Sequence, residues 1–114
     1  MNKKPLKSKP DKPRWSLLPY DTLEEVVKAF MEGAKKYEDD NWKINVIDKP
    51  RDYKDALMRH FKEYMCGLKV DPESELHPLA HLCANALILL WEELQEQKIN
   101  QIEKEYKQCH QKIV

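Results

Sequence analysis

The stretch from Leu79 to Trp91 constrains the fold most, because apolar residues occupy almost every side of a helix built from it. Other parts of the chain must cover such a helix, so we expect it to be central and buried. Pro78 suits its first helical position, because proline lacks the N–H that the first turn leaves unpaired. Beyond Glu92 the apolar residues follow a heptad-like spacing: Ile99, Ile102, Tyr106, Cys109 and Ile113. This spacing predicts a helical extension toward the C-terminal end.

Two further segments carry apolar residues at helical spacing. One covers residues 22–37, where Asp21 and Glu24 resemble a capping box. The other starts at the predicted cap Asp52 and ends at Gly67. Gly33 lies inside the first of these helices at a cost of about 1 kcal/mol relative to alanine, which indicates the close approach of a neighbouring helix or of a ligand.

Two segments between and before these helices are predicted to be non-helical. Residues 38–51 hold several poor helix formers and Pro50, with Trp42 isolated among them, so we expect a loop. Residues 15–20 are an apolar cluster that contains a proline. We expect this cluster to be an extended lead-in that packs on the helices.

The chain has 114 residues, of which 41% are hydrophobic and 35% charged, and only two are glycine. This composition favours amphipathic helices over turn-rich sheets, and the length suits one domain. We predict an all-α, compact domain with an antiparallel helix hairpin, the first helix packed across it, and a long C-terminal helix. Three parts are expected: a disordered basic tail over 1–14, the domain over 15–96, and a helical extension over 97–114. A hairpin this small is expected to pair with another copy in a homo-oligomer.

Charge and cysteine usage bear on the compartment and on partners. Residues 1–14 carry six Lys or Arg against Asp11 alone. We expect this tail to keep the protein in solution, with contact to nucleic acid as the less favoured alternative. Cys66, Cys83 and Cys109 form no CxxC pair, which favours a reducing setting. There is no membrane-length apolar run and no secretory pattern, so we expect a cytoplasmic protein without a membrane partner.

The glycine-rich phosphate loops are missing from the sequence. Because Gly33 and Gly67 are the two glycines, the chain has no Walker A loop, no dinucleotide-binding fingerprint and no nucleophile elbow. A protein of this kind can handle triphosphates only with metal ions and cationic side chains.

Polar residues in the most apolar helix are the most informative feature. His81 and Asn85 lie four apart, one turn above the other, and His77 precedes them by another four. Burying an unpartnered imidazole or amide costs roughly 1–3 kcal/mol. We therefore expect these side chains to have partners, either hydrogen-bonding groups of the protein or a metal ion.

His60 repeats this feature on the apolar face of the preceding helix. The connector between the two helices supplies Asp71 and Glu73. Together with the histidines of the next helix, these groups can hold a divalent cation or act as acid and base on an attacking water. Hydrogen bonding of each histidine inside the core is the alternative.

A second cluster pairs cations with aromatic rings at the end of the first predicted helix. Lys35 and Lys36 suit phosphate, and Tyr37 and Trp42 suit stacking on a base. Arg59 is a third candidate for phosphate. Periodicity alone favours core packing of Tyr37 and solvated lysines.

Short motifs in this order resemble the phage dATP/dGTP diphosphohydrolase domain over about residues 15–93. The motifs are Gly33-Ala-Lys-Lys-Tyr37, Asn41-Trp42, Arg59-His60, Asp71-Pro-Glu73-Ser74, and Leu79-Ala-His81 with Asn85. The chain departs from the family pattern at three places. Glu38 and Glu75 stand where the pattern has glycine, and His77-Pro78 stands where it often has Pro-His.

The resemblance implies an all-α enzyme related to the MazG-like pyrophosphohydrolases. Such an enzyme cleaves a purine dNTP to monophosphate and pyrophosphate with Mg²⁺ or Mn²⁺ and remodels the nucleotide pool. The implied catalytic residues are His60, Glu73, His81 and Asn85. The implied substrate contacts are Lys35, Lys36, Tyr37, Asn41, Trp42 and Arg59. The implied metal ligands are Asp71, Glu73, His77 and His81.

A non-catalytic interaction module is the rival hypothesis. In it the polar residues only organise the core, and the heptad-like extension and basic tail recruit partners. Metal dependence of stability and of turnover separates the two hypotheses.

Overall fold

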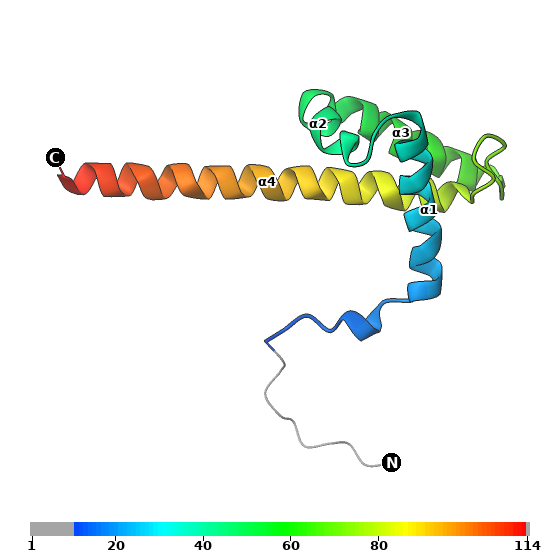
Figure 1. Ribbon diagram of the computed structural model, residues 1–114, viewed down its shortest axis with the longest axis horizontal. Coiled ribbons are helices and arrows are strands. Elements are labelled where there is room, and N and C mark those ends of the chain that lie inside the picture. The colour runs from blue at the N-terminus through cyan, green and yellow to red at the C-terminus, as the bar shows by residue number, and fades with distance from the viewer. Residues whose placement is uncertain (1–10, 114) are drawn as a thin grey trace, which may run out of the picture.

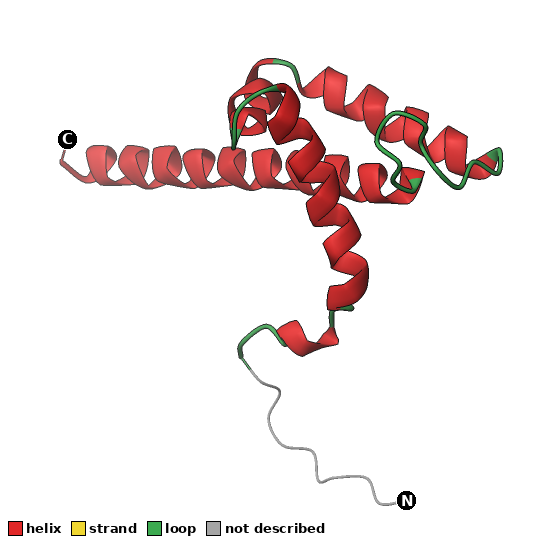
Figure 2. Cartoon of the chain, turned by 45° about the vertical axis from the view of Figure 1, so that its right-hand side comes forward, coloured by secondary structure: helices red, strands yellow, loops and turns green. Residues whose placement is uncertain are grey.

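Helices make up the regular structure of the described part of the chain. The computed structural model describes residues 11–113, and no strand occurs among them (Figure 2). A short 3₁₀ helix, Trp15–Leu17, precedes the α-helices. These are α1 (Tyr20–Lys36), α2 (Asn41–Asp48), α3 (Pro50–Met65) and α4 (Pro78–Ile113). The predicted all-α fold is confirmed, and so is Pro78 as the first residue of the last helix.

α3 and α4 form the antiparallel hairpin that the sequence predicts. Figure 1 shows α3 running along the first part of α4 in the opposite direction, with the connector of residues 66–77 between them. α1 crosses α4 steeply, and α2 lies beside α4. Because α4 contacts each of the other three α-helices, it is the central element, as expected.

The end of α3 confirms Gly67 as the predicted stop. Gly67 has a φ of 94°, a conformation that glycine adopts without steric cost. Its N–H donates to the Tyr64 carbonyl at 2.9 Å, and the Leu68 N–H donates to the Glu63 carbonyl at 3.0 Å. These two bonds make a Schellman motif, which satisfies the last carbonyls of α3 and turns the chain into the connector.

The predicted caps of α1 and α3 are wrong, because both helices start earlier, at or just after a proline. α1 begins after Pro19, and α3 begins with Pro50 in its first turn. Asp21 and Asp52 therefore lie inside the first turns, and no side chain caps either helix. At these positions the carboxylates still stabilise the helices, because they lie near the positive end of the helix dipole.

The predicted loop over residues 38–51 is also wrong, because eight of its residues form α2. Trp42 explains the difference. Its ring packs edge-on against Phe30 of α1 and Trp91 of α4, at centroid distances of 5.7 and 5.2 Å. Val46, one turn further on, is fully buried. Burial of these side chains overrides the weak helix preference of the segment.

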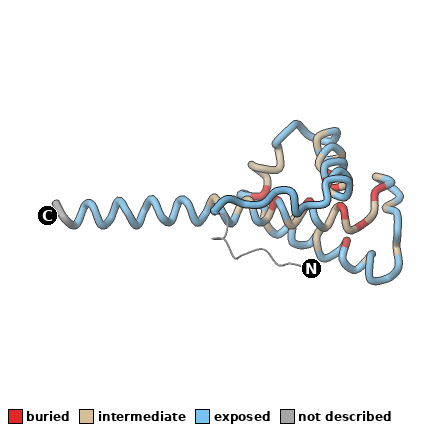
Figure 3. Tube along the Cα trace, turned by 90° about the horizontal axis from the view of Figure 1, so that it is seen from below, coloured by how far each residue is buried: buried red, intermediate tan, exposed pale blue. Residues whose placement is uncertain are grey.

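The core lies where α1 crosses α4. Its buried members are Val26, Ala29, Leu76, Ala80 and Ala84, with Phe30 packed against them. The small alanine side chains let the two helices approach closely. Figure 3 shows the buried positions clustered around this crossing, while the second half of α4 is exposed.

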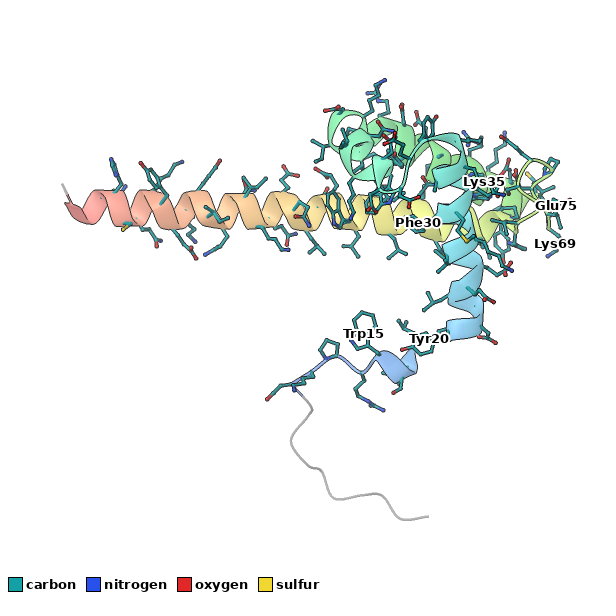
Figure 4. All side chains as sticks on the ribbon, viewed as in Figure 1. Trp15, Tyr20, Phe30, Lys35, Lys69 and Glu75 are labelled. Atoms are coloured by element: carbon teal, nitrogen blue, oxygen red, sulfur yellow. The ribbon has the colours of Figure 1, made fainter. Side chains whose placement is uncertain are left out.

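Two predicted burials are wrong. Leu87 and Leu90 are 46% and 54% exposed, so the apolar stretch of α4 is covered on one side only. The lead-in does not pack on the helices either, since Trp15 and Tyr20 are 67% and 58% exposed. Figure 4 shows these two side chains near each other and far from the crossing, and the Tyr20 hydroxyl donates to the Trp15 carbonyl at 2.7 Å. The physical reason is that the first half of α1 extends beyond the other helices (Figure 1).

The expected divisions of the chain can be placed on this structure. α4 continues without a break through residues 96 and 97, and the heptad-like positions Ile99, Ile102 and Tyr106 are exposed on its extension. The predicted disordered tail falls largely on residues 1–10, which lie outside the described residues.

Glu75 has a φ of 64°, in the left-handed region, which costs a non-glycine residue roughly 1–2 kcal/mol. It lies at the outer edge of the connector (Figure 4), at a position where the resembled pattern has glycine. We expect Glu75→Gly to raise the free energy of unfolding by about 0.5–1 kcal/mol, because relief of strain exceeds the added entropy of the unfolded chain. Denaturant titration measures this. Gly67→Ala, at another left-handed position, should lower stability. A loss of stability in Glu75→Gly would contradict the prediction.

Candidate functional site

A cavity of about 760 Å³ opens where the four α-helices and the connector meet. Its volume is in the range of small-molecule sites. It brings together ten of the predicted site residues: Lys36, Tyr37, Asn41, Trp42, Arg59, His60, Asp71, Glu73, His81 and Asn85. Two predicted site residues are not among those that line it, Lys35 and His77.

Gly33 also lines the cavity. A Cβ added there would meet no atom within 4 Å, so the expected close approach of a neighbouring helix is wrong. The alternative that the sequence left open, close approach of a ligand, stays a prediction.

Two stacked histidines form the centre of the site. His60 of α3 is buried, and its ring lies 4.7 Å from that of His81 of α4, with an interplanar angle of 18°. The His60 Nδ1 lies 2.8 Å from a carboxylate oxygen of Glu63, one turn along α3. Since a carboxylate only accepts hydrogen bonds, His60 donates through Nδ1. The antiparallel hairpin thus brings together two imidazoles that are 21 positions apart in the chain.

The connector places a hydroxyl and a carboxylate against His81. The Ser74 Oγ lies 2.6 Å from His81 Nε2 and donates to Asp71 Oδ2 at 2.9 Å. The Ser74 N–H donates to the same carboxylate oxygen at 3.0 Å. Backbone bonds between Asp71 and both Leu76 and Glu75 close the connector into a tight loop. This loop fixes the positions of Asp71 and Ser74 at the cavity wall.

Burial and hydrogen bonding shift the pKa of two groups in this network. Partial burial lowers the pKa of His81 below its ordinary 6.5, and the neighbouring His60 acts in the same direction against the nearby carboxylates. For Asp71, burial acts to raise the pKa, but the bonds from Ser74 and the adjacent histidines outweigh it, so the pKa lies below its ordinary 3.8. At neutral pH His81 is therefore uncharged and Asp71 is ionised.

The cationic residues predicted to bind phosphate differ in their surroundings. Lys36 forms a 2.7 Å ion pair with Glu73, and this hydrogen bond raises the pKa of Lys36. Lys35 does not line the cavity and pairs instead with Glu32 of α1. Arg59 of α3 lines the cavity. Lys36 and Arg59 are thus the cations that a ligand in the cavity meets.

The aromatic residues also separate into two kinds. Trp42 is half-buried and held edge-on between two other rings. Tyr37 is 64% exposed at the end of α1 and lines the same cavity. Its ring is therefore more accessible to a planar ligand than that of Trp42.

Asn85 and His77 make local contacts with the backbone. The Asn85 side-chain amide donates to the His81 carbonyl at 2.8 Å, within α4. His77 Nδ1 accepts the N–H of Leu79 at 3.0 Å and so satisfies a donor in the first turn of α4. Asn85 lines the cavity, whereas His77 does not.

Sequence reasoning missed three residues that matter to the site. Glu32 lines the cavity, although a charged residue on an amphipathic helix is ordinarily expected on the solvent side. Glu63 was detectable as the carboxylate one turn after His60. Ser74 belongs to the motif Asp71-Pro-Glu73-Ser74, but the sequence indicates no role for it, because a hydroxyl in a loop carries no periodic signal.

The donors for a metal ion are not preassembled in the described residues. Among residues 11–113, three donors within 4.8 Å of one another occur only at an acidic cluster on α4: Glu92, Glu93 and Glu96. The predicted ligands do not form such a group: Asp71, Glu73, His77 and His81. Mg²⁺, however, is commonly held by one or two carboxylates together with substrate phosphates and water. The donor chemistry of Asp71 and Glu73 fits a cation that arrives with a phosphate ligand.

The fold and the cavity define an all-α protein with a polar site that combines imidazoles, carboxylates, cations and aromatic rings. The family described as dATP/dGTP diphosphohydrolase, N-terminal, matches residues 2–102. The chain belongs to this family, as the motifs predicted. Curated proteins and solved structures gave no match. Among the described residues, no helix has the length and apolarity that crossing a membrane requires.

The lowered pKa of His81 predicts that acid destabilises the fold. As the pH falls below the ordinary histidine pKa of 6.5, the unfolded chain binds a proton that folded His81 does not, so the free energy of unfolding decreases. Asp71 adds a further loss at lower pH, because its lowered pKa stabilises the fold only while it is ionised. Denaturant titrations at a series of pH values, with chelator present, measure the slope. His81→Gln should flatten it in the histidine range, and an unchanged slope in this variant would contradict the prediction.

Proposed function

We propose that this protein hydrolyses purine deoxynucleoside triphosphates, dATP or dGTP, to the monophosphate and pyrophosphate. The observation that carries the proposal is the cavity itself, in which the stacked pair of His60 and His81 lies with Lys36 and Arg59. The family to which the chain belongs supports the substrate class. Such a reaction removes purine nucleotides from the precursor pool.

His81 is proposed as the group that takes the proton from the attacking water. A general base must be unprotonated at the working pH, and the lowered pKa of His81 meets this requirement. The water oxygen bonds to the phosphorus of the α-phosphate, the bond from that phosphorus to the bridging oxygen breaks, and pyrophosphate leaves. His60 lies against one face of the His81 ring and limits its rotation.

Lys36 and Arg59 are proposed to bind the phosphates, and Tyr37 to contact the base. Lys36 is 58% exposed in its ion pair with Glu73, so little desolvation opposes an exchange of that carboxylate for a phosphate. Arg59 offers a planar fork of donors suited to phosphate oxygens. The exposed ring of Tyr37 is available for stacking.

A divalent cation, Mg²⁺ or Mn²⁺, is proposed as part of the bound substrate. The carboxylates that line the cavity outnumber its lysine and arginine side chains: Glu32, Glu38, Asp39, Asp40, Glu63, Asp71 and Glu73 against Lys36 and Arg59. A bare triphosphate would meet net repulsion from this wall. When bound, the cation would neutralise phosphate charge, with Asp71 and Glu73 as its protein ligands.

A homo-oligomer is proposed as the working form. The exposed side chains Leu87, Leu90 and Leu94 form one stripe on α4, and Val27 and Met31 are exposed on α1. Buried hydrophobic residues of the described chain are few and mostly small, so a second copy that covers these faces would supply the missing core. The same stripe favours the second candidate function, a non-catalytic interaction module.

Turnover tests the enzymatic proposal directly. We expect purified protein to release monophosphate and pyrophosphate from dATP or dGTP with Mg²⁺ or Mn²⁺ and not with chelator, as measured by chromatography of all four dNTPs. His81→Ala should reduce turnover at least about 100-fold, because it removes the general base. His110→Ala, which removes an exposed histidine on the α4 extension, is the matched control and should keep full activity. Hydrolysis of no dNTP would favour the interaction module, and a folded, fully active His81→Ala would refute the assigned base.

Sedimentation tests the proposed assembly. We expect the wild-type protein to have the mass of a dimer or larger species, and Leu90→Glu to shift it toward monomer, because a charge in the apolar stripe must be desolvated on association. Lys107→Glu changes charge further along α4, on another side of the helix from the stripe, and should keep the wild-type mass. A monomeric wild-type protein would contradict the proposal.

A further inference from the structure

The Ser74 hydroxyl has hydrogen-bond partners on three sides. Asp71 Oδ2 lies 2.9 Å from it, His81 Nε2 lies 2.6 Å from it, and the Leu76 N–H points to it at 3.3 Å. A serine hydroxyl has one hydrogen to donate and two lone pairs that accept. Three partners therefore use its full capacity, and each partner is restricted to one role.

The direction of each bond follows from the chemistry of the partners. A backbone N–H only donates, so Leu76 takes one lone pair of Ser74 Oγ. The Asp71 carboxylate only accepts, so it takes the single hydroxyl hydrogen. The remaining lone pair faces His81, and a hydrogen bond forms there only if His81 Nε2 carries the hydrogen. A neutral imidazole with its hydrogen on Nε2 has its free lone pair on Nδ1.

We propose that Ser74, oriented by Asp71, is a positioning residue that fixes His81 in the tautomer with hydrogen on Nε2, so that Nδ1 is the atom that accepts the proton from water. This deepens the proposed function and rests on it, since it names the reacting atom of the assigned base. Ser74 acts only through His81.

Two further contacts hold the ring in this orientation. His60 stacks on His81 at 4.7 Å and is itself fixed by Glu63 through Nδ1. The connector loop holds Ser74 by a second bond, from its N–H to Asp71. A 180° flip of the His81 ring would place the carbon Cε1 where Nε2 now lies, so the hydrogen bond to Ser74 would be lost. The His81 ring is thus held at its face by His60 and at Nε2 by Ser74.

Long-range ¹H–¹⁵N spectra of the histidine rings test the inference in the free protein, above the histidine titration range. They distinguish hydrogen on Nε2 from hydrogen on Nδ1 at each ring. We expect His81 to show Nε2–H in the wild-type protein and a mixture of tautomers in Ser74→Ala. The Nδ1–H signal of His60 should stay unchanged in both and report that the hairpin is intact. Ser74→Thr keeps the hydroxyl and should restore the wild-type pattern.

Kinetics supply the second readout. Ser74→Ala should lower kcat about 10- to 100-fold, the usual loss when the partner of a functional histidine is removed, with KM little changed and with recovery in Ser74→Thr. Nδ1–H at His81 in the wild-type protein, or a tautomer that Ser74→Ala leaves unchanged, would overturn the inference. Nε2–H at His81 in a protein that hydrolyses no dNTP would refute the proposed function and the proton-accepting role of Nδ1, while the hydrogen-bond assignment would stand.

Discussion

The crossing of α1 over α4 is the contact on which the rest of the structure depends. Small side chains at this crossing, Ala29 on α1 and Ala80 and Ala84 on α4, let the two backbones come close. The last turns of α1 then lie over the hairpin, which brings Lys36 and Tyr37 to the cavity wall. A larger residue at any of the three alanines would push α1 outward and separate its cationic end from the histidines. The site is therefore a consequence of close helix packing.

The connector contributes to the site as much as the helices do. It is short, begins at a glycine-dependent helix end and is closed by its own backbone bonds, so Asp71 and Ser74 have little freedom. This rigidity accounts for the strained conformation of Glu75, because the chain must turn back there to reach Pro78. Strain at a turn beside a functional residue is a recurring feature of binding sites. A glycine at position 75 would remove this strain without removing a contact of the Ser74 hydroxyl, because none of those contacts involves the Glu75 side chain.

The sequence predicted those features that depend on local pattern. The helices over residues 22–37 and 53–66 could be predicted from the spacing of their apolar residues. The ten predicted site residues that line the cavity could be predicted because they belong to short motifs that resemble the family pattern. It did not predict α2, because that helix depends on the packing of Trp42 against rings 12 and 49 positions away. Ser74 was missed for a similar reason: its role exists only when the folded connector brings it to His81. The burial predicted for Leu87 and Leu90 failed because an apolar pattern shows that a face can be buried, not that another part of the chain covers it.

The exposed leucines of α4 bear on how the cavity and the proposed assembly relate. The cavity lies at the covered side of α4, whereas the apolar stripe lies on the side that the chain leaves open. A single segment of α4, about three turns long, thus carries polar residues toward the cavity and leucines away from it. A second copy on the leucine side would hold α4 from outside and so restrict motion at the crossing. Val27 and Met31, the exposed residues of α1 that the proposed contact also covers, line the cavity, so a second copy there would border the site as well as hold α4.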